Sequence, residues 1–175
     1  MCIRDRVLPA TEPVSEPEEA TAQELTPEPA PVIEDPVLRE IFDQESSGYI
    51  HQLRQQVDHA LINRVSLPCD KELVRLVHTL LGSARTAGVQ PIARISNRLE
   101  EWIRLLEEHN HSLEHEDLAV FQRSLLMMDR LRQWAIEPAF DQPDEEPIEV
   151  EIAARIDQLL VEILSAEPET EEGAH

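Results

Sequence analysis

The chain has 175 residues, enough for one ordinary domain with tails but not for a second domain of enzyme size. Its 15 Lys and Arg residues stand against 36 Asp and Glu residues, a formal net charge of −21 at pH 7. Because such a charge repels phosphate backbones and anionic lipid, nucleic acid and membrane surfaces are excluded as default partners.

The composition favours a helical domain with proline-rich flanks. Hydrophobic residues make up 41% of the chain and aromatic residues 3%, and there are 13 prolines. Leu, Ile and Val can build a core, while most prolines must lie outside its helices.

The charge is distributed unevenly along the chain. Residues 1–35 contain 9 acidic and 2 basic residues, and residues 137–175 contain 13 acidic and 1 basic residue, which leaves residues 36–136 nearly neutral at −2. We therefore expect a globular unit over residues 36–136. The acidic, Pro- and Glu-rich segments at residues 1–35, 137–147 and 166–175 are expected to be disordered linkers and a tail.

Two further absences bear on location. No apolar stretch reaches the length of a membrane span, and no apolar run follows Arg4 and Arg6 as it would in a signal peptide. The two cysteines, Cys2 and Cys69, fall in a tail and a loop, and we expect no disulfide between them. These features predict a cytoplasmic protein.

Apolar residues recur at helical spacing four times within the neutral region, over residues 38–61, 73–87, 92–106 and 118–135. Asp35 and Asp70 are placed to cap the first two helices, and Gly88 to end the second. Ser46–Gly48 could loosen the first helix. Four amphipathic helices joined by short polar turns predict an all-α, antiparallel up-and-down four-helix bundle.

A fifth amphipathic stretch covers residues 148–165. Because it is too short to be stable alone in water, it must dock on the bundle, pair with another chain or fray. We favour docking or self-pairing as an extra C-terminal helix.

The second helix carries an unusual set of residues on the face opposite its apolar stripe. His78, Leu81, Gly82 and Arg85 follow one another at helical spacing there, with Arg75 one turn earlier. His78 and Leu81 are therefore expected in solvent. Gly82 costs about 0.8 to 1 kcal/mol relative to Ala and leaves backbone bare one turn from the imidazole, which suits the close approach of another molecule.

The run from His78 to Gly88, HTLLGSARTAG, resembles the phosphoacceptor signature of histidine phosphotransfer (HPt) domains. It is most similar to the HPt modules of chemotaxis-type hybrid histidine kinases that control type IV pili and twitching motility. The resemblance implies a phosphorelay module that accepts a phosphoryl group on His78 and passes it to a receiver-domain aspartate. It also implies that Gly82 makes room for the phosphoryl group and that Glu100, 22 residues after the histidine, hydrogen-bonds the imidazole.

The chemistry explains these residue types. Phosphoryl transfer needs an in-line nucleophile and stabilisation of charge on the transferring oxygens. A carboxylate that holds one ring N–H of an imidazole leaves the other nitrogen free as the nucleophile. No nucleotide-binding motif or cofactor fingerprint is present, so the ATPase domain of a histidine kinase must act from the parent chain or in trans.

One departure from the family leaves the activity open. Leu81 stands where the family usually has a lysine, whose charge Arg85 could partly replace. Arg75 and Arg85 could also attract an acidic receiver, or could simply pair with nearby acids. The alternatives are a degenerate HPt-like bundle that binds partners without phosphorylation, and a plain scaffold that dimerises through residues 149–164.

A histidine-rich stretch raises the possibility of a metal site. It contains His109, His111 and His115, with Glu114 and Glu116. Their spacing fits no closed metal-site pattern, so we interpret the stretch as a polar turn and predict no metal.

Overall fold

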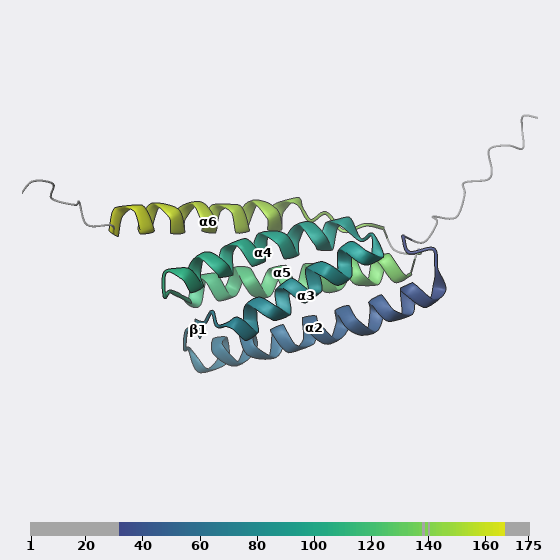
Figure 1. Cartoon of the computed structure of the whole chain (residues 1–175), viewed down its shortest axis with the longest axis horizontal. Helices are drawn as coiled ribbons and strands as arrows, with labels where there is room; N and C mark the ends of the chain where they lie inside the picture. The colour runs from purple at the N-terminus through teal and green to yellow at the C-terminus, as the bar shows by residue number, and fades with distance from the viewer. Residues whose placement is uncertain (1–31, 138, 140, 167–175) are drawn as a thin grey trace, which may run out of the picture. The chain divides into compact units, whose positions relative to one another are not determined.

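The computed structural model describes residues 32–137, 139 and 141–166. These residues form five helices and two very short strands (Figure 1). In chain order the elements are α2 (Pro36–Asn63), β1 (Leu67–Pro68), α3 (Lys71–Ala87), α4 (Gln90–Glu108), β2 (Ser112–Leu113), α5 (His115–Ile136) and α6 (Glu146–Ala166). The expected linker up to residue 31 and the tail from residue 167 lie outside the described residues.

The starts of α2 and α3 and the end of α3 agree with the capping signals in the sequence. Asp35 Oδ1 accepts the backbone N–H of Val37 at 2.8 Å, and Asp70 Oδ1 accepts that of Leu73 at 2.9 Å. Gly88 ends α3 with φ at 77°, a left-handed conformation that glycine adopts without strain.

Helix α2 runs unbroken for 28 residues, so the Ser46–Gly48 run does not loosen it. Ser46 is buried and its hydroxyl donates to the carbonyl of Phe42, which satisfies its polar atom inside the core. Ile41 is one of the apolar residues that recur at helical spacing over residues 38–61 and were expected to face inward, but it is 46% exposed. It precedes the buried Phe42 by one residue, and successive residues of a helix point about 100° apart.

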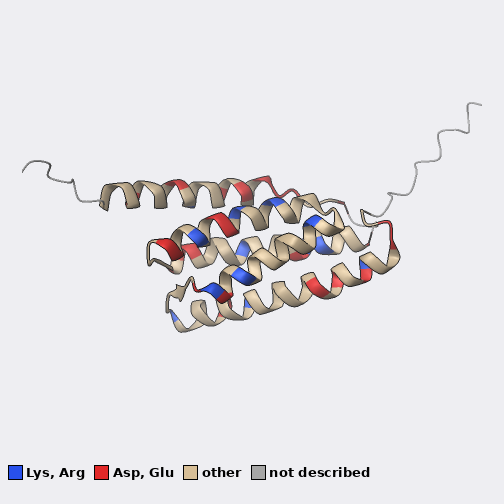
Figure 2. Cartoon of the chain, viewed as in Figure 1, with Lys and Arg blue, Asp and Glu red and all other residues tan. Residues whose placement is uncertain are grey.

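Helices α2 to α5 form the predicted four-helix bundle. α3 lies between α2 and α4, and α5 packs against both α2 and α4, so that the four helices enclose one core (Figure 1). β1 pairs antiparallel with β2, with Leu67 opposite Leu113, and thereby ties the α2–α3 connection to the α4–α5 connection. Acidic and basic residues are interspersed along these helices, as expected for a nearly neutral unit (Figure 2).

The packed unit begins before α2. Ile33, inside the segment expected to be a linker, is 2% exposed and belongs to the core. Its carbonyl oxygen accepts two N–H groups of Arg39, at 3.0 and 2.9 Å.

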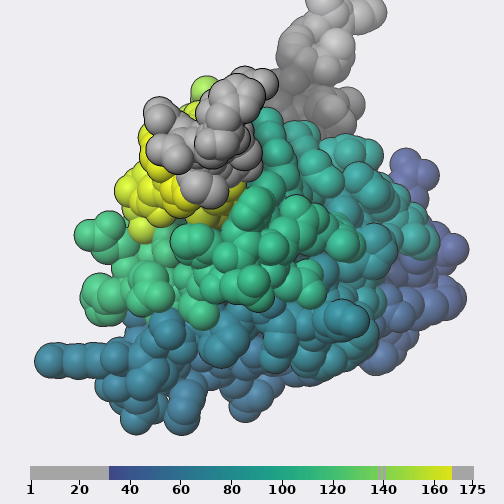
Figure 3. Space-filling view, turned by 60° about the vertical axis from the view of Figure 1, so that its left-hand side comes forward, coloured from purple at the N-terminus to yellow at the C-terminus, as the bar shows by residue number. Residues whose placement is uncertain are grey.

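Helix α6 docks on the bundle, one of the outcomes expected for the fifth amphipathic stretch. It packs against α4 and α5 (Figures 1 and 3). Its buried residues are Ile148, Ile152, Ile156 and Leu159. Ion pairs border this contact: Arg94 of α4 bonds to Glu145 and Glu149, and Arg123 of α5 lies 2.6 Å from Glu151.

The chain from residue 32 to residue 166, as far as the structure describes it, holds no helix with both the length and the apolarity needed to cross a bilayer. Cys69 is buried in the connection that precedes α3, and burial raises the pKa of its thiol to about 12.

Candidate functional site

The predicted phosphoacceptor, His78, stands on the outer face of α3 with 63% of its side chain exposed. The opposite face of α3 is buried because its apolar residues recur at helical spacing. The buried residues are Leu73, Val74, Leu76, Val77, Leu80, Leu81, Ala84 and Ala87. Asp70 and Gly88 fix the two ends of the helix, so the imidazole is held on a rigid element.

Glu100 lies beside His78, as the resemblance implied. α3 and α4 are packed neighbours, and Glu100 Oε1 is 2.8 Å from His78 Nδ1. The carboxylate side chain is only 11% exposed, although the imidazole is open to solvent. Among the described residues, no hydrogen bond engages the second ring nitrogen, Nε2.

Arg104, which the sequence analysis did not single out, completes this cluster. Its Nε and Nη2 atoms donate to the same Glu100 Oε1, at 2.9 and 2.6 Å. Arg104 follows Glu100 by four residues on α4, a spacing that brings side chains together on a helix. The spacing of four residues is the sequence signal that could have pointed to Arg104. It indicates a role at this site only when Glu100 is known to face His78.

The surroundings of Glu100 act on its pKa in opposite directions. Burial tends to raise the pKa, because it disfavours the charged form, while hydrogen bonds from Arg104 and His78 lower it. The lowering effects prevail, and the pKa of Glu100 lies below its ordinary value. The carboxylate is therefore ionised at neutral pH and accepts hydrogen bonds from both partners.

Gly82 leaves open space one turn beyond His78. The position is exposed, and a Cβ atom added to it would meet nothing within 4 Å. The next residue, Ser83, donates its hydroxyl to Glu45 of α2 at 3.1 Å. Gly82 is thus not required by packing within the chain itself.

The expected exposure of Leu81 is wrong. Leu81 is 3% exposed and belongs to the hydrophobic core, so it contributes to no apolar surface patch. The buried face of α3 is therefore wider than the apolar stripe predicted from the sequence. It includes Leu81, which follows the buried Val77 by one turn. α3 has neighbours on two sides, α2 and α4, and a helix held between two others buries a broader face.

The two arginines of the predicted partner-facing set differ. Arg75 forms an ion pair with Glu72 on its own helix, with Nη2 2.7 Å from Oε1. It therefore pairs with a nearby acid, which was one of the two expectations for this residue. Arg85 is exposed, and within the described residues it makes no ion pair with Glu100 or any other acid. The charge near Glu100 comes from Arg104 and not from Arg85.

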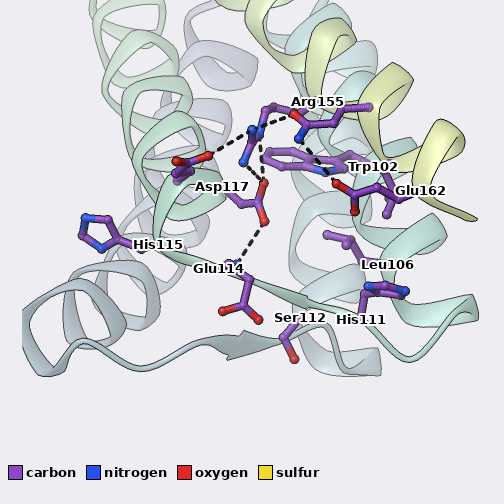
Figure 4. Close-up of a pocket in the computed structure, with 12 residues that line it drawn as sticks. Trp102, Leu106, His111, Ser112, Glu114, His115, Asp117, Arg155 and Glu162 are labelled. Carbon is purple, nitrogen blue, oxygen red and sulfur yellow. Dashed lines mark hydrogen bonds and ion pairs between the residues drawn. The ribbon is translucent and has the colours of Figure 1, made fainter.

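The histidine-rich turn borders a separate cavity of about 390 Å³ between α4, α5 and α6. Figure 4 shows Arg155 of α6 joined to Asp117 of α5, with His111 and His115 at opposite edges of the cavity. Across the part of the chain that the structure describes, no cluster of three or more side chains is suited to hold a metal ion. This cavity includes neither His78 nor Glu100.

The fold is thus a four-helix bundle that presents an exposed imidazole, hydrogen-bonded to a carboxylate of the next helix. Residues 37–134 match the family model of the Hpt domain, and the chain belongs to this family. Such domains carry out histidine phosphotransfer in phosphorelays and typically interact with kinases and receiver domains. Searches among curated proteins and among solved structures gave no match.

Proposed function

We propose that His78 is the phosphoacceptor of this domain and that it passes the phosphoryl group to an aspartate of a receiver domain. The proposal rests on one observation: an exposed imidazole whose Nδ1 lies 2.8 Å from a nearly buried carboxylate. Glu100 accepts the Nδ1 proton in a hydrogen bond, which fixes the tautomer and leaves the lone pair of Nε2 directed to solvent.

The transfer then needs no further group from this chain to remove a proton. Nε2 attacks phosphorus, the bond between phosphorus and its donor breaks, and the ring keeps its proton on Nδ1. The carboxylate of Glu100 stabilises the positive charge that develops on the ring. In the reverse half of the relay the P–Nε2 bond breaks as an aspartate oxygen of the receiver bonds to phosphorus.

Phosphorylation with phosphoramidate, a small donor, tests the site without a cognate kinase. We expect an acid-labile, alkali-stable increase in mass on wild type that peptide mapping places at His78, and its loss in His78→Gln. His59 is a matched control, since it is exposed on α2 and its Nδ1 lies 3.2 Å from an amide, that of Asn63, instead of a carboxylate. His59→Gln should keep the modification.

The same experiment separates the proposal from its alternatives. If His78→Gln accepts phosphate as fast as wild type, His78 is not the acceptor. If wild type is never modified and transfers nothing to a purified receiver domain, the bundle is a binding scaffold without phosphotransfer. Dimerisation through residues 149–164 would have to use exposed apolar residues such as Leu160, Val161 and Leu164, because Ile152, Ile156 and Leu159 are already buried on α4 and α5.

We propose further that the domain is a cytoplasmic module of a chemotaxis-type hybrid histidine kinase that controls type IV pili. The His78–Gly88 run and the Pro- and Glu-rich composition of the flanking sequence support this context. Reading the surrounding genomic sequence tests it. An ATPase domain or a receiver domain in the same reading frame is expected, and a reading frame that holds neither, with no kinase gene nearby, would contradict the proposal.

A further inference from the structure

Three hydrogen-bond donors converge on one oxygen atom at the site. His78 Nδ1, Arg104 Nε and Arg104 Nη2 lie 2.8, 2.9 and 2.6 Å from Glu100 Oε1. The arginine therefore donates two N–H groups of its rigid guanidinium to the same oxygen atom that accepts from the imidazole. A lysine ammonium could not reproduce this planar contact.

We propose that Arg104 is a positioning residue for phosphotransfer, acting on His78 through Glu100. It keeps the carboxylate charged and fixed in place, so that Nδ1 carries the ring proton and Nε2 presents its lone pair. This inference rests on the proposed role of His78 as phosphoacceptor.

The burial of Glu100 explains why a second cation is needed. A carboxylate with an 11% exposed side chain has lost most of its hydration, and burial by itself favours its neutral form. A protonated Glu100 could donate to Nδ1 instead of accepting from it, which would move the ring proton to Nε2 and remove the nucleophile. The permanent charge of Arg104 opposes that change.

The sequence of this chain makes Arg104 the available source of that charge. The lysine that the family usually carries three residues after the histidine is replaced by Leu81, which is buried in the core. Arg85 makes no ion pair with Glu100, whereas Arg104 reaches it from the same helix. In this chain the positive charge beside Glu100 therefore comes from α4 and not from α3.

Arg98 provides a matched control for Arg104. Both lie on α4, their side chains are 49% and 50% exposed, and each pairs with a glutamate of its own helix. Arg98 bonds to Glu101, 3.3 Å away, which has no contact with His78 in the described structure. Glu101 is 48% exposed and Glu100 only 11%, so Arg104→Gln should cost more stability than Arg98→Gln, and a urea-unfolding control must show that both variants are folded under the assay conditions.

The rate of phosphorylation by phosphoramidate is the first test. This donor is a small molecule, so no partner protein has to dock on the domain and no docking contact is lost in a variant. We expect Arg104→Gln to lower the rate at least about tenfold, because it removes the positive charge and the two N–H donors that Arg104 gives to Glu100. Arg98→Gln should leave it unchanged, and Arg104→Lys should restore part of it. In a Glu100→Gln background, Arg104→Gln should have almost no further effect. An equal tenfold loss in that background would show that Arg104 acts elsewhere and would overturn the proposal.

The tautomer of His78 gives a second test that needs no phosphodonor. In wild type, ¹⁵N NMR of the imidazole should show the proton on Nδ1, and Arg104→Gln should shift the population toward Nε2, while Arg98→Gln should not. An unchanged tautomer in Arg104→Gln would also overturn the proposal. If wild type is never phosphorylated, the proposed function fails, yet the NMR measurement still decides whether Arg104 orients the ring.

Discussion

At the scale of single residues, the environment of each ring nitrogen distinguishes His78 from the other exposed histidines. His59 also has its Nδ1 in contact with a side chain, but the contact is an amide of Asn63 on its own helix. The Nδ1 of His78 meets an ionised carboxylate that a different helix holds in place. Only a carboxylate both fixes the tautomer and stabilises positive charge on the ring.

The first prediction concerns Gly82. Because a Cβ would meet nothing within 4 Å, Gly82→Ala should stabilise the folded chain by about 0.8 to 1 kcal/mol, the helix preference of Ala over Gly. The added methyl group should at the same time slow phosphoryl transfer to a receiver domain, which must approach the bare backbone beside His78. Urea unfolding and a transfer assay measure the two effects.

Gly48→Ala is the control for this prediction. Gly48 also lies within a helix, and a Cβ atom added to it would meet no atom within 4 Å, but it lines a surface hollow that does not include His78. Its substitution should stabilise the chain equally and leave transfer unchanged. Unimpaired transfer in Gly82→Ala would show that no partner approaches this turn closely.

The second prediction concerns the pH dependence of stability. The folded protein holds the pKa of Glu100 below its ordinary value of 4.5, so ionised Glu100 stabilises the fold. That contribution is complete above 4.5 and is lost as pH falls through the lowered pKa of the folded state. The stability advantage of wild type over Glu100→Gln should therefore be largest near neutral pH and shrink in acid. Denaturant unfolding of both proteins, from neutral pH to below pH 4.5, measures this stability difference. A difference that grows in acid would contradict a lowered pKa of Glu100.

At the scale of secondary-structure elements, α6 extends the folded unit beyond the part that matches the family. The match ends at residue 134, yet four apolar residues of α6 are buried against α4 and α5. Arg155 of α6 also donates a hydrogen bond from its Nε to Oδ1 of Asp117, at the start of α5, over 2.9 Å. The helix is stable because it docks, since an isolated helix of this length would be marginal in water.

The third prediction tests this docking with two substitutions on α6. Ile152 is fully buried, and Ile152→Ala should destabilise the chain by about 2 to 5 kcal/mol through the cavity it leaves. Val161 on the same helix is 63% exposed, and Val161→Ala should change stability by less than about 0.5 kcal/mol. Urea unfolding provides both values. Equal effects of the two substitutions would mean that α6 is not packed on the bundle in solution.

At the scale of the whole molecule, one core joins the bundle and α6. Trp102 of α4 is 1% exposed and its ring centroid is 6.3 Å from that of Phe121 on α5. Trp102 also borders the cavity shown in Figure 4. Leu159 of α6 lines the same cavity. A single tryptophan therefore lies beside three helices and can report on whether they separate together.

The fourth prediction is that the bundle and α6 unfold in one transition. In a Trp134→Phe background, Trp102 is the sole tryptophan, and its fluorescence should change at the same urea concentration as the far-UV circular dichroism. The reason is that undocking α6 would expose its apolar stripe and the surface of α4 and α5 that it covers. A fluorescence change that precedes the loss of helicity would show that α6 separates first.

The four bundle helices, the caps Asp35 and Asp70 and the stop at Gly88 could be predicted because their signals are local: apolar spacing, a side chain that caps free N–H groups, and a residue that tolerates positive φ. The pairing of Glu100 with His78 came from a resemblance, and the geometry between α3 and α4 agrees with it. The exposure of Leu81 was predicted wrongly, because a helix wheel does not show how many neighbours a helix has.

By itself, then, the amino-acid sequence determined which segments are helical, most of the apolar face of each helix, and that His78 stands outside the core. Tertiary structure alone decided that Leu81 is buried, that α6 rests on α4 and α5, and that Arg104 shares an oxygen atom of Glu100 with His78. The physical reason is the separation along the chain over which each interaction acts. Helix formation and capping depend on residues within a few positions of each other, whereas burial and ion pairing between helices depend on how separate segments pack.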